Sequence, residues 1–341
     1  MSTYEHWQAF RTVAPGVGVL IALAGTAWAI STFAIGVNPL IIAIILGFIV
    51  ANGYGVPDWA GDGVGTHKLW LEAGIVVMGA QIALGTIIDA GPIVLLFIVG
   101  VLAFTVVFVE IISRGIFDLP DKMGSLLASG SGVCGVSAIV ATAASIRANG
   151  NHIAYAVATI LLFDMVTLAL YPVIGRLLAL PDIVFGIWAG VSMYSTGPVV
   201  AAGFAYSTVA GEWATITKLT RNALIGLVAV GYALYYARRG EAVESVGNKW
   251  RYVWDKFPKF VIGFLFAMLL ASAVALSDAQ LEAIEGTYQG LFLVAFVGLG
   301  ISMRFGEMRE AGLTPIAVIV TALVTVSTLS LGLAYLLFHV V

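Results

Sequence analysis

The sequence predicts an all-α polytopic membrane protein of about eleven transmembrane helices, with inverted repeats and discontinuous helices. Its composition is the first reason, because 60% of the 341 residues are hydrophobic and only 10% are charged, against about 25% charged in a soluble domain. The second is a succession of long apolar segments, typical of bilayer-spanning helices. The third is that glycine and serine interrupt two of these segments.

Eleven apolar segments are candidates for bilayer-spanning helices, which need about 20 mostly apolar residues. Pro39, Pro92 and Pro315 lie near the start of a segment, where a missing N–H costs little. We expect one transporter domain, residues 1–341, with approximate halves 1–180 and 181–341. The candidate segments are 16–35, 38–52, 69–88, 92–112, 123–147, 153–175, 183–207, 212–237, 258–277, 288–305 and 313–338.

Lysine and arginine predict the orientation in the cell (inner) membrane. Eleven membrane passes with a cytoplasmic N-terminus put the C-terminus outside. In this orientation nearly all basic residues of the loops lie in the cytoplasm, and Arg147 is the exception. If 123–147 and 183–207 were both re-entrant hairpins, Arg147 and Arg176 would exchange sides and the balance would not change. Whether these segments span or re-enter therefore stays open.

Segment 123–147 is the centre of the functional prediction. Its middle, Ser129 to Gly135, holds three glycines and two serines in seven residues, so we expect the helix to break and restart at about Val136. A restarted helix offers free N–H groups and a positive dipole end to an anion. Alternatively, small residues only let neighbouring helices approach. The predicted anion-binding residues here are Ser131, Gly132, Cys134, Gly135 and Ser137.

Segment 183–207 predicts a second broken helix. Pro198 has no N–H to donate and fits the first turn of a restarted helix, although a structural proline kink is the alternative. Two discontinuous helices in one chain indicate a binding site. If both segments span, they run in the same direction and cannot be inverted copies. The predicted binding residues here are Ser195, Thr196 and Gly197.

Three ionisable residues within the predicted spans are functional candidates by default. Lys218 and Arg221 are three residues apart on one helix face and would suit a dianion; the alternative is that they snorkel to the interface. Asp164 lies mid-span, where it could carry a coupling proton or act as a counter-ion to the cations. Asn38 and Asn52 flank the second segment, and we expect them to cap helix ends.

An internal repeat joins residues 78–91 to residues 299–312. Our orientation runs the two segments in opposite directions, which is typical of inverted repeats in secondary transporters. The matches place Gly79, Gly85, Asp89, Ala90 and Gly91 on Gly300, Gly306, Glu310, Ala311 and Gly312.

Other classes of function find little support in the sequence. Gly130 to Gly135 matches G-x-G-x-x-G, but no strand precedes it, so we do not expect a dinucleotide site. Cys134 is the only cysteine, with no histidine near it in sequence, and is expected to pack rather than react. We expect no enzyme activity, no cofactor, no metal site and no nucleic-acid partner.

The residues above resemble the YeiH family (UPF0324), whose members are often labelled sulfate exporters. The resemblance rests on Ser129–Ala138 followed by Arg147, Ala156–Pro172, Val199–Gly203, Lys218 with Arg221, and Leu299–Gly312. It implies a fold similar to bile-acid and cation/proton transporters, with crossed broken helices. Two departures set this chain apart: Tyr194–Pro198 replaces the usual His-acid-x-Ala-Gln run, and Asp164 stands where small residues are usual.

The sequence therefore predicts a secondary transporter, an exporter of a small sulfate-like anion, working by alternating access. The expected partners are the small anion, the lipid bilayer and a coupling ion, proton or sodium; a homodimer is left open. A passive anion channel using the same residues, or a membrane-embedded binding scaffold without transport, is the alternative.

Overall fold

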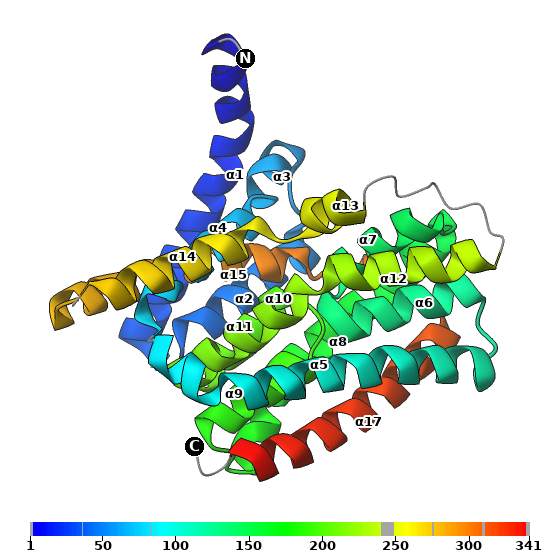
Figure 1. Ribbon diagram of the computed structural model, residues 1–341. Coiled ribbons are helices and arrows are strands. Elements are labelled where there is room, and N and C mark those ends of the chain that lie inside the picture. The colour runs from blue at the N-terminus through cyan, green and yellow to red at the C-terminus, as the bar shows by residue number, and fades with distance from the viewer. Residues whose placement is uncertain are drawn as a thin grey trace. The chain divides into compact units, whose positions relative to one another are not determined.

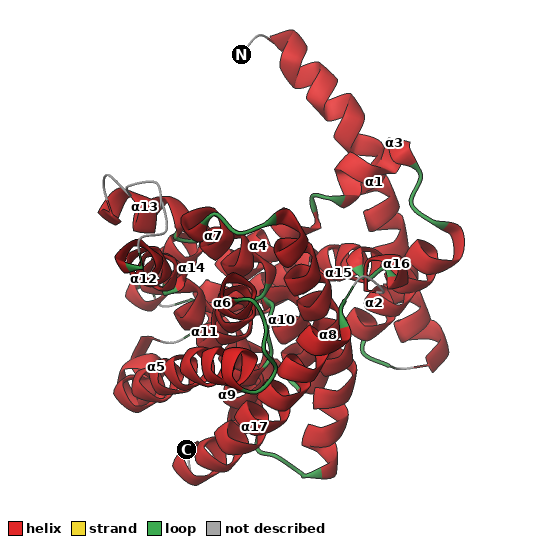
Figure 2. Cartoon of the chain, turned by 90° about the vertical axis from the view of Figure 1, so that its right-hand side faces the viewer, coloured by secondary structure: helices red, strands yellow, loops and turns green. Residues whose placement is uncertain are grey.

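The computed structural model describes residues 3–35, 37–82, 84–239, 249–274, 276–308 and 311–338. Within these ranges the regular structure is helical, and loops join the helices (Figure 2). The predicted all-α fold class is confirmed to that extent. The chain divides into two compact units, one of residues 1–87 and 260–305 and the other of residues 88–259 and 306–341. The single transporter domain with approximate halves 1–180 and 181–341 stays a prediction.

Figure 1 labels most of the α-helices along the chain. Each helix belongs to the unit that holds most of its residues. The first unit contains α1 (Thr3–Ile30), η1 (Ser31–Ile35), α2 (Pro39–Ile49), η2 (Val50–Tyr54), α3 (Asp58–Val64), α4 (His67–Met78), η3 (Gly79–Gln81), α14 (Lys259–Ala273) and α15 (Asp278–Ser302). The second contains α5 (Leu84–Gly115), α6 (Asp121–Ser129), η4 (Gly130–Cys134), α7 (Val136–Ile146), α8 (Gly150–Leu177), α9 (Asp182–Ser192), α10 (Thr196–Tyr206), α11 (Thr208–Ala223), α12 (Ile225–Arg238), α13 (Lys249–Lys256), α16 (Phe305–Met308) and α17 (Leu313–Phe338).

Five described helices are long and apolar enough to cross a membrane by themselves, and a pair bent by 75° at the start of α14 makes a sixth candidate. The predicted count of about eleven relies on shorter and broken helices as well and stays a prediction. The five spans are Arg11–Phe33, Gly91–Gly115, Gly150–Leu177, Asp278–Ser302 and Leu313–Phe338.

Segments 69–88, 212–237 and 288–305 differ from the helices that form. Segment 69–88 is not one helix, since α4 ends at Met78 and α5 begins at Leu84; Pro92 consequently lies inside α5 instead of near its start. Segment 212–237 divides at Leu224 into α11 and α12. Helix α15 begins at Asp278, ten residues before the predicted start. Apolar composition locates a membrane segment well, but it does not show where a helix breaks or how far it extends past the apolar region.

The two repeat segments share a local structure in the first unit. After α4 and η3 the backbone is extended at Ile82 (φ −89°, ψ 118°) before α5 begins, and after α15 a break at Met303 (φ −86°, ψ 82°) precedes α16. In the predicted alignment these two residues coincide. The opposite direction of the two copies stays a prediction, and Glu310 lies outside the described residues.

Asparagine side chains cap helix ends in this unit, as predicted. Asn38 Oδ1 accepts a hydrogen bond from Leu40 N at 2.9 Å in the first turn of α2. Asn52 donates to the Met303 carbonyl at 2.8 Å and accepts from Phe305 N at 2.9 Å, so it bridges the gap between α15 and α16. Both side chains therefore have a structural role.

Segment 123–147 is a hairpin in the second unit, because the chain reverses between α6 and α7. A Cβ on Gly130 would lie 2.8 Å from Cγ1 of Ile139, whereas nine residues of straight helix would separate them by about 13.5 Å. Leu126 and Leu127 of α6 share a hydrophobic cluster with Ile139 and Ala143 of α7. We call α6, η4 and α7 the first hairpin.

Segment 183–207 reverses in the same way, and we call α9 and α10 the second hairpin. Phe185, near the start of α9, stacks on Tyr206 at the end of α10, with 3.9 Å between the ring centroids. The Tyr206 hydroxyl donates to the Leu180 carbonyl at 2.6 Å. The two ends of the second hairpin are therefore in contact, as they are in a re-entrant segment.

Helix α8 connects the two hairpins and sets their relation. The first hairpin ends just before Gly150 and the second begins just after Leu177, so their bases lie at opposite ends of a 28-residue helix, about 42 Å long. The hairpins point toward each other from those ends. The prediction that the two segments run in the same direction was therefore wrong, because it assumed that both pass straight through.

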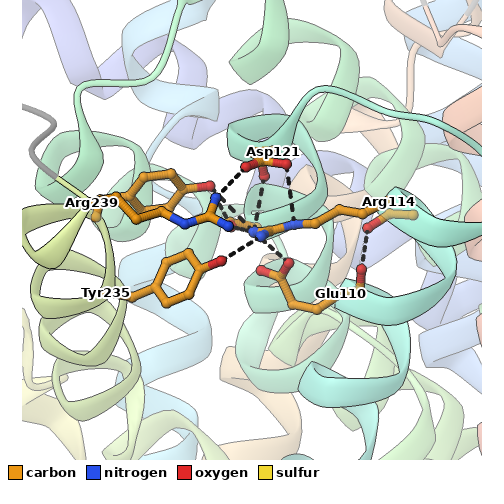
Figure 3. A network of polar contacts seen from close by, with 8 residues as sticks. Glu110, Arg114, Asp121, Tyr235 and Arg239 are labelled. Atoms are coloured by element: carbon orange, nitrogen blue, oxygen red, sulfur yellow. Dashed lines mark hydrogen bonds and ion pairs between the residues drawn. The ribbon is translucent and has the colours of Figure 1, made fainter.

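A polar network anchors the base of the first hairpin (Figure 3). Arg114 of α5 pairs with Glu110 at 2.6 Å and donates to the Tyr235 hydroxyl at 2.8 Å. Asp121, the first residue of α6, pairs with Arg239 at 2.5 Å and lies 3.7 Å from Arg114. The network thus joins the hairpin base to both α5 and α12.

Candidate functional site

The tip of the first hairpin is a glycine turn. Gly135 has φ +66° and ψ −131°, a conformation that is strained for a residue with a side chain. It follows the π-helical turn η4 and is the N-cap of α7, which begins at Val136. The predicted break and restart at Val136 are confirmed. Since the helix restarts here, the first N–H groups of α7 have no intrahelical partner.

The tip of the second hairpin is a short extended segment. Helix α9 ends at Ser192, Met193 (ψ 161°) and Ser195 (ψ 151°) are extended, and α10 begins at Thr196. Pro198 is in the first turn of α10, as predicted, where its missing N–H leaves no hydrogen bond unmade. The second break is therefore also confirmed.

The two tips touch each other. A Cβ on Gly135 would lie 2.1 Å from the Ser195 Oγ and 3.2 Å from the Ser195 Cβ, so a side chain at this contact would force Ser195 to shift. Gly135 is the N-cap of α7 and Ser195 is the N-cap of α10. The N-termini of both restarted helices, and thus the positive ends of two helix dipoles, converge at one place.

Lys218 of α11 contacts both hairpin tips. Its side chain is fully buried, and its Nζ donates to the carbonyls of Val133 at 3.0 Å and Met193 at 3.2 Å, and to the carbonyl of Tyr194. The first carbonyl belongs to the first hairpin and the other two to the second. Three acceptors use all three donors of an ammonium group.

Arg221, one turn further along α11, makes the same kind of link. It is 1% exposed. Nε donates to the Gly132 carbonyl at 3.1 Å, Nη1 to the Gly190 and Met193 carbonyls at 2.8 and 2.9 Å, and Nη2 to the Ser131 and Gly132 carbonyls, both at 2.8 Å. These five bonds use all five donors of a guanidinium.

The two cations therefore occupy the C-terminal, negative ends of α6 with η4 and of α9. Snorkelling to the interface is excluded, because both charged groups are buried against hairpin carbonyls. With every donor of Lys218 and Arg221 taken, an anion at the tips would experience their charge through space. The sequence could place the pair on one face, but it could not show that backbone oxygens are its partners.

Asp164 lies at the middle of α8 and contacts Ser195, the residue of the second tip that precedes α10. It is 2% exposed. Oδ1 accepts a hydrogen bond from Ser195 N at 2.9 Å, while Oδ2 is buried without a hydrogen-bond partner. Among the described side chains no ion pair joins Asp164 to Lys218 or Arg221, so the carboxylate caps the N-terminus of α10 instead of contacting the cations.

Asn222 is a site residue that the sequence analysis did not assign. Its Nδ2 donates to the Thr196 Oγ1 at 2.9 Å, and its Oδ1 is buried without a hydrogen-bond partner. Because it is four residues after Lys218, it shares that helix face, and this spacing was the signal that could have found it. Ser195 Oγ and Thr217 Oγ1 are also buried without a hydrogen-bond partner.

The remaining predicted residues differ in their environment. The Ser131 hydroxyl donates to the Leu127 carbonyl at 2.7 Å, within its own helix. Cys134 is buried with a free thiol, Ser137 is exposed and Gly197 is half-buried. Their role in binding stays a prediction. We call the place where the two hairpin tips meet the crossing. The structure brings together there Gly132, Gly135, Asp164, Ser195, Thr196, Lys218 and Arg221.

Comparison with known proteins gives the family. The family described as "Conserved hypothetical protein 698" matches residues 15–319. The chain belongs to this family. A UPF0324 membrane protein of Nitratidesulfovibrio vulgaris is 32% identical over 82% of this chain and 78% of its own length. UPF0324 membrane protein Atu0671 of Agrobacterium fabrum is 28% identical over 93% and 87%.

The resemblance to UPF0324 that the motifs predicted is thereby confirmed, and so is the assignment to the membrane. A second UPF0324 membrane protein of N. vulgaris is 31% identical, and the chain spans 54% of its length. No solved structure matches this chain significantly. The geometry of the hairpin crossing in this UPF0324 chain therefore has to be interpreted from its own residues.

Proposed function

We propose that this UPF0324 membrane protein is a secondary transporter that exports a small, sulfate-like anion by alternating access. The observation that carries the proposal is the contact of Gly135 with Ser195, because it brings two helix N-termini together inside the protein. Helix N-termini bind anions through free N–H groups and the dipole. Discontinuous helices that meet at mid-membrane are typical of substrate sites in secondary transporters.

The arrangement of charge supports an anion over a cation as substrate. Lys218 and Arg221 neutralise the carbonyl ends of the broken helices. Asp164 accepts a hydrogen bond from one N-terminal residue, Ser195, while no carboxylate of the described residues accepts a hydrogen bond from the N-terminus of α7. A negatively charged ligand would complete the pairing of positive helix ends with negative groups.

The hairpin topology supports alternating access. The two hairpin bases lie at opposite ends of α8, so opening either hairpin would expose the crossing to a different side of the membrane. All residues of the crossing belong to the second compact unit. Replacing two predicted spans by two re-entrant hairpins removes two passes through the membrane. Since the number of passes stays odd, we still propose a cytoplasmic N-terminus and an outside C-terminus.

We propose transport without catalysis: the crossing provides hydrogen-bond donors and charge, and no cofactor enters the scheme. A proton or sodium would be the coupling ion, and a homodimer is compatible with the proposal. A channel with the same residues would show single-channel current steps, and a binding scaffold would bind the anion without moving it.

Tracer flux in proteoliposomes tests the proposal. We expect saturable sulfate flux and counter-flow in the wild type, and loss of both in Gly135→Ala, whose Cβ would meet Ser195 Oγ. Gly100→Ala is the matched control, because a Cβ on Gly100 of α5 meets nothing within 4 Å. Failure of reconstituted wild-type protein to bind or move any small anion would refute the proposal.

A further inference from the structure

The charges at the crossing do not cancel. Two helix C-termini and two helix N-termini meet there, and their partial charges of about −0.5 and +0.5 each sum to zero. The side chains contribute two positive charges, Lys218 and Arg221, and one negative charge, Asp164. The crossing therefore carries a net charge of +1, from +2 and −1, and a buried uncompensated charge is costly.

The protonation of the two cations is fixed by their partners. The Lys218 Nζ has three carbonyl oxygens around it, and only an ammonium has three N–H donors to offer them. Arg221 uses five donors and remains charged in proteins. The negative side of the balance is therefore the adjustable one.

Asp164 is the group that can adjust it. Oδ1 is engaged by Ser195 N, whereas Oδ2 is buried and has no hydrogen-bond partner, so it has a lone pair for a proton. The titratable groups that interact with Asp164 are Lys218 of α11 and Tyr194 at the second tip. Arg221 and Cys134 interact with Lys218, and Tyr171 of α8 interacts with Tyr194.

We propose that the crossing binds small oxyanions so that the oxyanion and any proton bound with it have a total charge of −1, which we call the cargo charge. The cargo is either a monovalent oxyanion alone, or a divalent oxyanion together with one proton on Asp164 Oδ2. With a monovalent ion, the bound charge of −1 balances +2 from the cations and −1 from Asp164. With a divalent ion, protonation of Asp164 leaves +2 to balance −2. The inference rests on the proposed anion transport and adds a rule for which ions, and how many protons, move.

The proton is accounted for at both ends of the cycle. It comes from water on the side where the dianion binds, forms an O–H bond at Oδ2, and returns to water when the dianion leaves. No other bond forms or breaks. The protonated Oδ2 also becomes a donor, which can face an oxyanion where a carboxylate would repel it.

Isothermal titration calorimetry of the purified protein, in two buffers that differ in ionisation enthalpy, counts the protons taken up on binding. For the wild type we expect about one proton per sulfate and none per nitrate. Sulfate affinity should fall about tenfold for each unit of rising pH once Asp164 is ionised, while nitrate affinity stays constant.

Asp164→Asn fixes the charge of this position at zero and keeps an oxygen for Ser195 N. In this variant sulfate should bind without proton uptake and without pH dependence, and nitrate should bind at least as tightly as to the wild type, because loss of the Asp164 charge makes the crossing more positive. Asp182→Asn, an exposed position at the base of the second hairpin, is the matched control and should behave as the wild type.

The outcomes separate the inference from the proposed function. Sulfate binding to the wild type without proton uptake, or unchanged proton uptake in Asp164→Asn, overturns the cargo rule and leaves anion transport standing. Absence of binding for sulfate and nitrate alike overturns both. The wild-type proton count needs no variant, so the test holds even if Asp164→Asn fails to fold.

Discussion

The guanidinium of Arg221 donates two hydrogen bonds to one oxygen, the Gly132 carbonyl, from Nε at 3.1 Å and from Nη2 at 2.8 Å. Gly132 lies in the turn η4 that leads into the first tip, and α11 holds the arginine. One buried side chain thereby fixes the last turn before the break.

Replacing Arg221 by alanine should abolish flux, because five hydrogen bonds to both hairpins are lost. The protein in detergent should lose at least about 3 kcal/mol of stability, since hydrogen bonds to charged groups contribute about 1.5–3 kcal/mol each. Thermal unfolding and tracer flux measure the two effects. Arg238→Ala, at an exposed position of α12, is the control. Normal flux in Arg221→Ala would remove this residue from the site.

Replacing Lys218 by methionine keeps an unbranched chain of similar length but removes the charge. The net charge of the crossing falls from +1 to 0, so anion binding should weaken at least tenfold, or about 1.4 kcal/mol. Calorimetric titration with nitrate measures the change. Lys218→Arg retains the charge and should recover part of the affinity. Equal affinity in the wild type and Lys218→Met would show that this charge does not act on the ligand.

Cys134 is a built-in reporter of the first tip, because it is the only cysteine of the chain and is 6% exposed. A maleimide should label it slowly, and a saturating anion that holds the tips together should slow it several-fold further. Intact-protein mass spectrometry over time gives the rate. A cysteine introduced at the 80% exposed Leu177 should react rapidly with or without anion. Rapid, anion-independent labelling of Cys134 would contradict a closed tip.

The network at the base of the first hairpin should control opening more than stability. Asp121 and Arg239 are 45% and 48% exposed, and an exposed ion pair contributes at most about 1 kcal/mol. Asp121→Asn should therefore leave the thermal midpoint nearly unchanged and raise the labelling rate of Cys134. The same midpoint with an unaltered labelling rate would mean that the base does not restrain the tip.

The breaks could be predicted from sequence and the reversals could not. Three glycines near Gly135 indicate a helix that stops, since glycine destabilises a helix interior and accepts positive φ. The same sequence is equally compatible with a helix that continues in the same direction after the break. The decision rests on contacts such as Phe185 with Tyr206, which are 21 residues apart in the sequence and have no periodic signature.

The candidate site was also predicted only in part. Spacing placed Lys218 and Arg221 on one face, and its position in the middle of a predicted span made Asp164 a candidate. Their partners are backbone carbonyls and an N–H group, which every residue type possesses and no sequence pattern identifies. Asn222 was missed because an amide after a cation motif resembles a helix cap as much as a ligand contact.

Locating a bound anion tests the central claim most directly. Perrhenate is a monovalent oxyanion whose rhenium atom is visible by anomalous scattering in soaked crystals. We predict an anomalous peak where the N-termini of α7 and α10 meet, beside Gly135 and Ser195. A peak confined to exposed basic residues, with none at the meeting point of the two hairpins, would contradict it.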